Sequence, residues 1–515
     1  MKRNMKKIIF ALVLAGGLFS SCDMDKKPYG SLDDQTAIQT LNDCFRFRNG
    51  LYSSLRGMTA GSWINFPEIQ MDIFQGLSDN GNQVGPFSIG NILSSDQDIE
   101  GFWGSVYGVI NKANYIIEKM EVLKESDTFS DEDRIELNRY EGESRFVRAF
   151  CYFWLADHFC QSYTTTNAQT AAMGLPLVTK YYPTADRSMY PGRSTQDETY
   201  KLINDDLEVA YTALKAYEAS SSKNAPTPNA AYLSSYTVLA LQARIALAKG
   251  ENQLALSKAE EVISSNVYSL TGIDDYLALW NEDKGSEVLF RPFMTSTELG
   301  SSTGGSYYLS ATEESAWYIP TQSMLMLYDE GDIRFDAFFK LYPNLKVSGE
   351  PYPAYVFNKF PGNESLKTGA QPNFMNMMKP FRLSEQYLIA AEAAANLGGS
   401  NANKANNYLN ALRAKRIAGY ENDEYSGNAL INAVRVERLK ELIGEGFRLS
   451  DLRRWGEGFV RDASYDQINP DVEDIFVVAG RDVTYQPDDY RYVWPIPASE
   501  IQANPQLDGQ QNPGY

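Results

Sequence analysis

Two stretches of the sequence, "AAYLSSYTVLALQARIALAKGENQLALSKAEEVISS" (230–265) and "RLSEQYLIAAEAAANLGGSNANKANNYLNALRAKR" (382–416), share one pattern. In each, an alanine-rich apolar run ends at a glycine, Gly250 or Gly398, and a short polar turn leads into a second run with small residues. Glycine supplies the left-handed conformation that stops a helix, and small residues let two antiparallel helices approach closely. The pattern predicts helix–turn–helix pairs of the tetratricopeptide type, in scattered and degenerate copies.

The remaining regular segments also predict helices. Apolar residues recur near helical spacing in three further segments: 101–123, 142–159 and 199–214. Long irregular stretches that hold many of the Gly, Pro, Tyr and Asn residues separate the helical blocks: 58–98, 162–195, 266–380 and 457–515. Loops this long tend to be functional in compact domains. We therefore expect a mostly α fold, in which tetratricopeptide-like helix pairs form a scaffold with a large loop-rich, ligand-binding face.

The amino-terminal residues have the pattern of an export signal. Four cations precede an apolar run from Ile8 to Phe19, which is shorter than the roughly 20 residues of a membrane span. Two small serines lead directly to Cys22, an arrangement that resembles a lipobox, whose cysteine is acylated and becomes the first mature residue. Acyl chains anchor a protein because each buried CH₂ contributes about 0.8 kcal/mol. We expect residues 1–21 to be a lipoprotein signal peptide and Cys22 a membrane tether; the alternative is an ordinary signal peptide with an incidental cysteine.

Composition narrows the choice of partners. The formal net charge is −19, and removing the four cations of residues 1–21, a segment without Asp or Glu, leaves −23. Such acidity argues against nucleic acid or anionic lipid as the main partner and favours a neutral ligand. Three cysteines remain after Cys22: Cys44, Cys151 and Cys160. Three is an odd number, and Cys151 and Cys160 are separated by about 13 Å on one expected helix, so we expect no disulfide framework.

The segment "ERLKELIGEGFRLSDLRRWG" (437–456) resembles the signature of the SusD/RagB family, the surface lipoproteins of paired glycan-uptake systems in Gram-negative bacteria. The lipobox and four further segments agree with this family in order along the chain. The segments are "RFVRAFCYFWLADHFC" (145–160) with "GLPLV" (174–178), "RLSEQYLIAAEAAANLGG" (382–399), "LNALRAKR" (409–416) and "WPIPASEIQANPQLDGQQNPGY" (494–515). The resemblance therefore runs from end to end, and it is weakest over 270–380.

The resemblance implies an architecture, a location and a partner. It implies a single SusD-like domain over residues 22–515, with an N-terminal part of about 22–220 and a C-terminal SusD/RagB part of about 221–515. It also implies an outer-membrane lipoprotein that faces the exterior, captures an oligosaccharide or polysaccharide and delivers it to a SusC-like TonB-dependent transporter, over which it would sit as a hinged lid. In that arrangement the repeat helices face the transporter and the loop face takes the glycan.

The residues themselves argue against catalysis. Glu437, Glu441 and Glu445 lie at helical spacing within the signature, but the neighbouring arginines are expected to hold the pKa values of these carboxyl groups low. The single histidine, His158, lies in an apolar helix and is expected to pack. No phosphate-binding loop or zinc spacing is present, so we expect no cofactor and no metal. The oxygen-rich "SDNGNQ" (78–83) leaves calcium as an alternative there, although it lacks the EF-hand pattern.

Sugar binding needs aromatic faces for the C–H side of a pyranose and paired polar groups for its hydroxyls. Five tryptophans are expected to pack: Trp103, Trp154, Trp280, Trp455 and Trp494. Trp63 and Trp317 stand in the expected loops, and the region of Trp317 resembles the place where starch-binding members carry an aromatic arc. The expected ligand-binding residues are Trp317, Tyr307, Tyr308, Trp63, Asp79, Asn80, Asn82 and Phe87. For Trp317 the alternative is that it fills the junction between loops and helices.

Two other functional classes remain open on the sequence. Aromatic and amide side chains also suit peptides, so the chain could take up peptides or another nutrient in the same kind of uptake pair. A lipid-anchored glycan hydrolase is the less favoured possibility. Glycosidases need a pair of carboxylates, but a chain with 66 acidic residues contains some such pair by chance, so a pair alone is weak evidence for hydrolysis.

Overall fold

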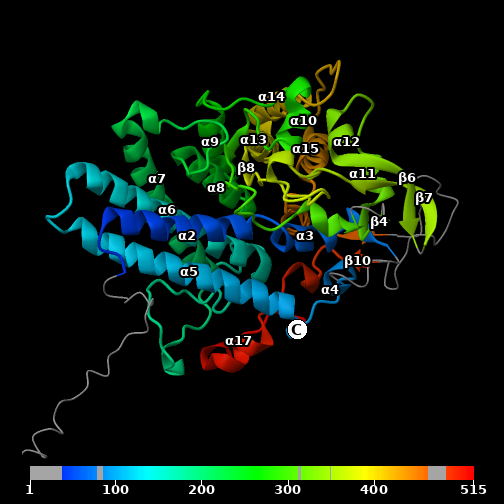
Figure 1. Cartoon of the computed structure of the whole chain (residues 1–515). Helices are drawn as coiled ribbons and strands as arrows, with labels where there is room; N and C mark the ends of the chain where they lie inside the picture. Colours follow the sequence, from blue (N-terminus) through cyan, green and yellow to red (C-terminus); the bar gives the residue numbers. More distant parts are fainter. Residues whose placement is uncertain (1–36, 78–84, 311–314, 348, 462–482) are drawn as a thin grey trace, which may run out of the picture.

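The computed structural model describes residues 37–77, 85–310, 315–347, 349–461 and 483–515. The fold is mostly helical, as expected (Figure 1). Long helices from the N-terminal half lie alongside one another, and strands β4 (Ser315–Ala316), β6 (Phe339–Val347), β7 (Glu350–Phe357) and β10 (Val483–Tyr485) lie at the opposite end of the molecule. The predicted helical scaffold with an irregular face is thus the architecture that the described residues adopt.

Four long helices form the N-terminal part of the scaffold: α2 (Leu41–Met58), α5 (Gln97–Lys124), α6 (Asp131–Phe159) and α7 (Gln196–Ser220). Helix α6 packs against the other three. Helices α2, α6 and α7 each begin with a capping box, such as Ser130 with Asp133, in which side chain and backbone satisfy each other's free N–H groups. Local sequence therefore sets where these helices start.

The two stretches quoted first form the predicted helix pairs. The second part of the scaffold comprises α8 (Ser235–Ala248), α9 (Asn252–Ile263), α13 (Leu383–Leu397), α14 (Ala402–Arg413) and α15 (Gly427–Leu442). The turns contain Gly250 and Gly398 with φ of 74° and 63°, the left-handed conformation that glycine adopts without strain. Helix α13 packs on α8, α9, α14 and α15, and a buried alanine-rich cluster fills these contacts. The small residues that predicted close packing of the helices therefore lie buried between them.

Short elements occupy the stretches that the sequence left irregular. The short helices are α3 (Ser62–Ile69), α4 (Gly85–Ser88), α10 (Ile273–Asn281), α11 (Gln322–Leu325), α12 (Ile333–Phe338), α16 (Arg448–Trp455) and α17 (Ala498–Ala503). The strands form antiparallel pairs: β1 (Phe74–Gly76) with β5 (Tyr318–Pro320), β2 (Val288–Phe290) with β8 (Phe381–Arg382), β3 (Tyr308–Ser310) with β4 (Ser315–Ala316), β6 (Phe339–Val347) with β7 (Glu350–Phe357), and β9 (Phe459–Arg461) with β10 (Val483–Tyr485). Only the β6–β7 hairpin is long.

The C-terminal motif fastens the end of α6. Trp494 is fully buried, and its backbone N–H donates to the carbonyl of His158 at 2.7 Å. Asn512 Nδ2 donates to the carbonyls of Phe159 and Trp494, each at 2.8 Å. His158 itself packs, as predicted: its ring stacks on Trp154 with centroids 4.2 Å apart. The C-terminal end of the chain is therefore hydrogen-bonded to the end of helix α6 in the N-terminal scaffold.

Two further observations concern cysteines and membrane spans. Cys44, Cys151 and Cys160 are buried and free, which agrees with the expected absence of a disulfide framework among these three. Within the described ranges, no helix combines the length and the apolar character that crossing a membrane requires.

Candidate functional site

A small ribbon joins the two loop regions that the sequence singled out. Strand β1 pairs with β5 in the register Phe74 to Pro320 and Gly76 to Tyr318. The backbone N–H of Leu77 extends this ribbon by donating to the carbonyl of Trp317 at 2.9 Å. The loop expected to carry polar ligand contacts leaves the ribbon directly after Leu77. Two segments about 240 residues apart thus meet at Trp317.

Trp317 lies where the ribbon meets the β3–β4 pair. Its backbone N–H donates to the carbonyl of Tyr307 at 3.1 Å, which fixes its main chain from a second side. The side chain is half-buried and packs at the edge of the core formed around β1, β5 and β7. Its indole N–H is enclosed and has no hydrogen-bond partner among the described residues. Part of the ring therefore faces outward while the N–H end points into the protein.

The two tyrosines before Trp317 are core residues, which corrects the expectation that they contact ligand. Tyr307 is fully buried, with its ring centroid 4.8 Å from those of both Phe74 and Phe357. Tyr308 is 7% exposed and stacks on Phe374 at 4.3 Å with the rings nearly parallel. Neither ring presents a free face, so both support the surface rather than form it.

Phe87 and Trp63 also take structural places. Phe87 is fully buried and its ring lies 4.7 Å from Phe66, so the expectation that it stacks on a sugar is wrong. Trp63 lies on helix α3 rather than in a loop, and it is half-buried. Its ring meets Trp154 and Phe102 edge-on at 4.7 and 4.8 Å. It belongs to an aromatic cluster between α3, α5 and α6.

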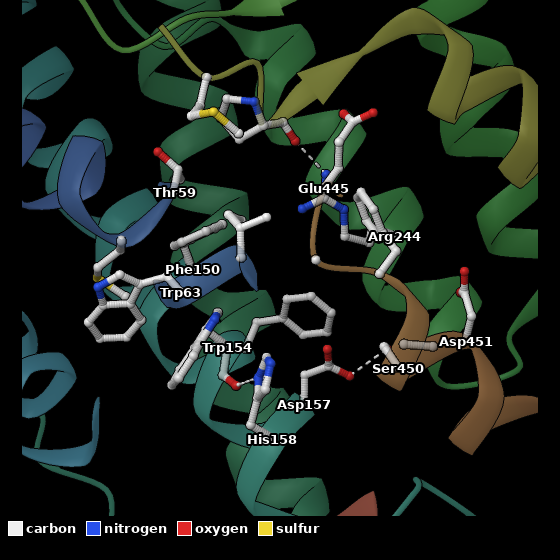
Figure 2. Close-up of a pocket in the computed structure, with 18 of the residues that line it drawn as sticks. Thr59, Trp63, Phe150, Trp154, Asp157, His158, Arg244, Glu445, Ser450 and Asp451 are labelled. Carbon is white, nitrogen blue, oxygen red and sulfur yellow. Dashed lines mark hydrogen bonds between the residues drawn. The ribbon is translucent and has the colours of Figure 1, made fainter. Parts of the chain in front are cut away.

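Trp63 borders an interior cavity that is too small for a sugar (Figure 2). The volume is about 90 Å³, whereas ligand pockets measure ~300–1,000 Å³. Several of the polar side chains around it are paired within the protein: Ser450 and Arg453 both donate to Asp157 Oδ1 at 2.7 Å, and Arg244 forms an ion pair with Glu385. This cavity is a packing feature and not the candidate site.

Several expected residues lie outside the described part of the chain. Asp79, Asn80 and Asn82 belong to residues 78–84, as does the whole of the segment considered for calcium (78–83). Cys22 belongs to residues 1–36. Among the described residues, no group of three or more His, Cys, Asp or Glu side chains is placed to hold a metal ion. The polar residues of the expected site, Asp79, Asn80 and Asn82, therefore remain a prediction from the sequence.

The β6–β7 hairpin adds aromatic residues that sequence reasoning missed. Tyr342, Tyr352 and Tyr355 are half-buried and, like Trp317, border the core around β5 and β7. Tyr355 stands opposite Leu341, which is 47% exposed. The signal was present in "KLYPNLKVSGEPYPAYVF" (340–357), where two runs with aromatic residues flank a Ser-Gly turn. The candidate site is thus the surface around this core to which Trp317 and the hairpin tyrosines contribute half-buried rings, and we call it the aromatic face.

The signature glutamates hold the scaffold together. Glu441 is fully buried and receives three guanidinium groups: Arg382 at 2.9 Å, Arg416 at 2.9 Å and Arg334 at 3.2 Å. Although burial raises a carboxyl pKa, these arginines hold the pKa of Glu441 well below its ordinary value. Glu445 pairs with Arg382 and Lys359, and its pKa is also lowered in spite of burial. Carboxylates kept ionised and enclosed cannot act as general acids, so this cluster is structural.

Two other signature side chains, Arg448 and Asp451, connect neighbouring segments. Arg448 binds Asp72 with two hydrogen bonds of 2.8 and 2.6 Å, which ties helix α16 to the start of the β1–β5 ribbon. Asp451 accepts from Arg438 and Arg454. The tryptophans expected to pack behave accordingly: Trp103, Trp154, Trp280 and Trp494 are buried, and Trp455 is half-buried with its indole N–H on Glu392. The signature therefore connects the scaffold to the site.

Comparison with known families agrees with the resemblance. A family model described as "SusD family" matches residues 338–515, and another described as "Starch-binding associating with outer membrane" matches residues 60–239. Together the two matches cover more than half of the chain. The chain belongs to the SusD/RagB family.

Individual relatives extend over nearly the whole chain. "SusD-like protein P25" of Formosa agariphila is 24% identical over 580 aligned positions, which cover 99% of this chain and all of that protein. A SusD superfamily protein from Bacteroides thetaiotaomicron has a similar solved structure, with 28% identity, a TM-score of 0.76, and coverage of 92% of this chain and 100% of that one. A "Laminarin binding SusD-like protein" shares the fold at 22% identity and a TM-score of 0.65, over 92% of this chain and 99% of that one. SusD-like proteins with carbohydrate ligands are thus among its structural neighbours.

Proposed function

We propose that this protein binds a neutral oligosaccharide or polysaccharide, without catalysis, on the aromatic face formed by Trp317 and the β6–β7 hairpin. The observation that carries this proposal is the meeting of two distant loop regions at a half-exposed tryptophan, through the β1–β5 ribbon. A pyranose presents an apolar C–H face to such rings, and the loop at 78–84 supplies amide and carboxylate groups for its hydroxyls. The net charge of −19 favours a neutral chain over an acidic polysaccharide.

The proposal extends to location and partner. Cys22 is the lipid attachment site, and the mature chain is held at the outer membrane with its aromatic face toward the exterior. From there it delivers the glycan to a SusC-like TonB-dependent transporter. The lipobox pattern and the family description "Starch-binding associating with outer membrane" support this placement. The residue types suit no nucleic-acid partner, because the chain is strongly acidic.

A binding assay on residues 23–515 tests the glycan proposal. We expect retention on at least one glycan of a panel of plant, host and microbial polysaccharides in affinity gels, with a Kd by calorimetry. Trp317→Ala should weaken that binding at least tenfold. Tyr182→Ala is the matched control, because this tyrosine is 65% exposed and lies on the 161–195 connection outside the site. Equal losses in both variants, or binding of peptides and no glycan, would contradict the proposal.

Two cell experiments test location and delivery. Replacing Cys22 with alanine should release the protein from the membrane fraction and remove the acyl label from it. Proteolysis of intact cells should digest the wild-type protein if it faces outward. Purification of the tagged wild-type protein from solubilised membranes should recover a TonB-dependent barrel in stoichiometric amount, and recovery of the protein alone would count against the partnership.

A further inference from the structure

A groove of about 800 Å³ runs between helices α2 and α5, on the N-terminal part of the scaffold. Its walls are largely apolar, with Phe47 and Leu51 from α2 and Ile116 from α5. Two exposed cations, Arg46 and Lys112, stand on its borders. None of these residues belongs to the aromatic face described above, so the groove is a separate feature.

The groove is shaped to admit backbone at close range. Gly50 and Gly108 lie in the middle of their helices, where glycine costs about 1 kcal/mol relative to alanine. A Cβ at either position would meet nothing within 4 Å, so no described neighbour requires a glycine there. Asn111 also lines the groove, and its side-chain oxygen is enclosed without a hydrogen-bond partner among the described residues. Small residues and an unsatisfied acceptor together leave room for an extended segment and offer its backbone a hydrogen-bond acceptor.

The chain's own start provides such a segment. Ala37, the first described residue, lines the groove, so the preceding segment "DMDKKPYGSLDDQT" (23–36) begins from inside it. Helix α2 advances about 15 Å between Leu41 and Leu51 at 1.5 Å per residue. Nine residues of extended chain span about 30 Å, which is enough to follow the groove back along α2.

The composition of that segment matches the groove. Tyr29 and Leu32 are apolar side chains for its walls, and the adjacent Asp33 and Asp34 suit the two cations on its borders. Gly30 and Ser31 are small enough to pass over the glycines. We propose that residues 28–36 bind back into the α2–α5 groove.

Docking of residues 28–36 has a consequence for the anchored protein. This consequence rests on the proposed lipid attachment at Cys22. Only residues 23–27 would remain as a free tether, about 17 Å at full extension. The body would then be held close to the lipid surface, with the α2–α5 side of the scaffold nearest to it. The docking itself does not depend on lipidation, and it can be tested on the unlipidated chain 23–515.

Hydrogen–deuterium exchange on residues 23–515 tests the proposal directly. Backbone amides of residues 29–36 should exchange at least tenfold more slowly than in a free peptide of the same sequence. Gly108→Leu places a side chain in the groove and should return these amides to the free-peptide rate. Gly104→Leu is the matched control, because Gly104 is exposed on the same helix, has equal free space and does not line the groove. Free-peptide rates in the wild type, or equal loss in both variants, would overturn the proposal.

A charge exchange provides an independent readout. Asp33→Lys with Asp34→Lys should speed exchange of the segment, and adding Arg46→Glu with Lys112→Glu should restore the slow rate. Failure of the second pair to rescue the first would contradict the assignment of these partners. Size-exclusion chromatography with light scattering accompanies both tests: a dimer that disappears in Gly108→Leu would make a second copy the occupant and overturn the proposal. None of these readouts involves glycan, so they fail separately from the proposed function.

Discussion

The helix scaffold and the aromatic face of this protein differ in how far apart in the sequence their contacting residues lie. The α8–α9 and α13–α14 pairs form within about 35 residues of chain each, and their glycine stops and alanine faces lie in the same local pattern. On the aromatic face, the β6–β7 hairpin is local, but the place of Trp317 depends on strands of two or three residues, and β1 reaches its partner β5 across more than 240 positions. A surface of this kind can change its loops while the scaffold stays constant. Substitutions should therefore affect folding in one region and binding in the other.

The strongest test of the scaffold removes the charge of Glu441. Glu441→Gln leaves three buried arginines without their shared carboxylate, and breaking a buried ion cluster from one side costs about 3–5 kcal/mol. We expect a loss of that size in the urea-derived free energy of unfolding, or no folded protein. Asp205→Asn is the control, since its pair with Lys201 is exposed and such pairs contribute about 1 kcal/mol or less. A Glu441→Gln protein as stable as the control would show that the cluster does not hold the scaffold.

Low pH should destabilise the protein through the same cluster. Glu441 and Glu445 have folded-state pKa values below their ordinary value of 4.5, so their contribution to stability is present above about pH 4.5 and is lost as pH falls through the folded pKa. Each proton taken up on unfolding changes stability by about 1.4 kcal/mol per pH unit. We expect the contribution of these two groups to the unfolding free energy to vary little between pH 7 and 5 and to fall below pH 4.5. Glu445→Gln should show a shallower acid slope, and an unchanged slope would remove Glu445 from the explanation.

How far apart in the sequence contacting residues lie also determines which features could be predicted from the sequence. Gly250 and Gly398 signal helix ends because the turn they permit is local, whereas the arginines around Glu441 (Arg334, Arg382 and Arg416) all lie outside the signature. Tyr307 and Phe87 could not be recognised as core residues, because each lies in a single helical turn whose burial depends on partners far along the chain. Trp317 was identified through the family resemblance, whereas the tyrosines of the β6–β7 hairpin escaped notice although two runs with aromatic residues flank a Ser-Gly turn there.

A smaller effect is expected from overfilling the contact between helix pairs. Ala391 is fully buried in α13 within the alanine-rich cluster. Ala391→Leu adds three carbon atoms to a packed interface and should cost about 1–3 kcal/mol, measured as a lower urea midpoint at unchanged slope. Asn407→Leu, at an exposed position of α14, is the matched change and should stay within about 0.5 kcal/mol of the wild type. Equal effects would mean that the helix pairs tolerate looser packing than their small residues suggest.

The smallest change in stability is expected on the aromatic face. Tyr352 is half-buried on β7, so Tyr352→Ala should lower the unfolding free energy by about 1 kcal/mol or less. If the hairpin forms part of the glycan site, the same change removes one stacking face worth about 0.5–1.5 kcal/mol, a roughly two- to twelvefold loss of affinity. Calorimetric titration with the glycan retained by the wild type measures this loss. A Tyr352→Ala protein that binds as the wild type does, while Trp317→Ala does not, would confine the site to the ribbon and exclude the hairpin.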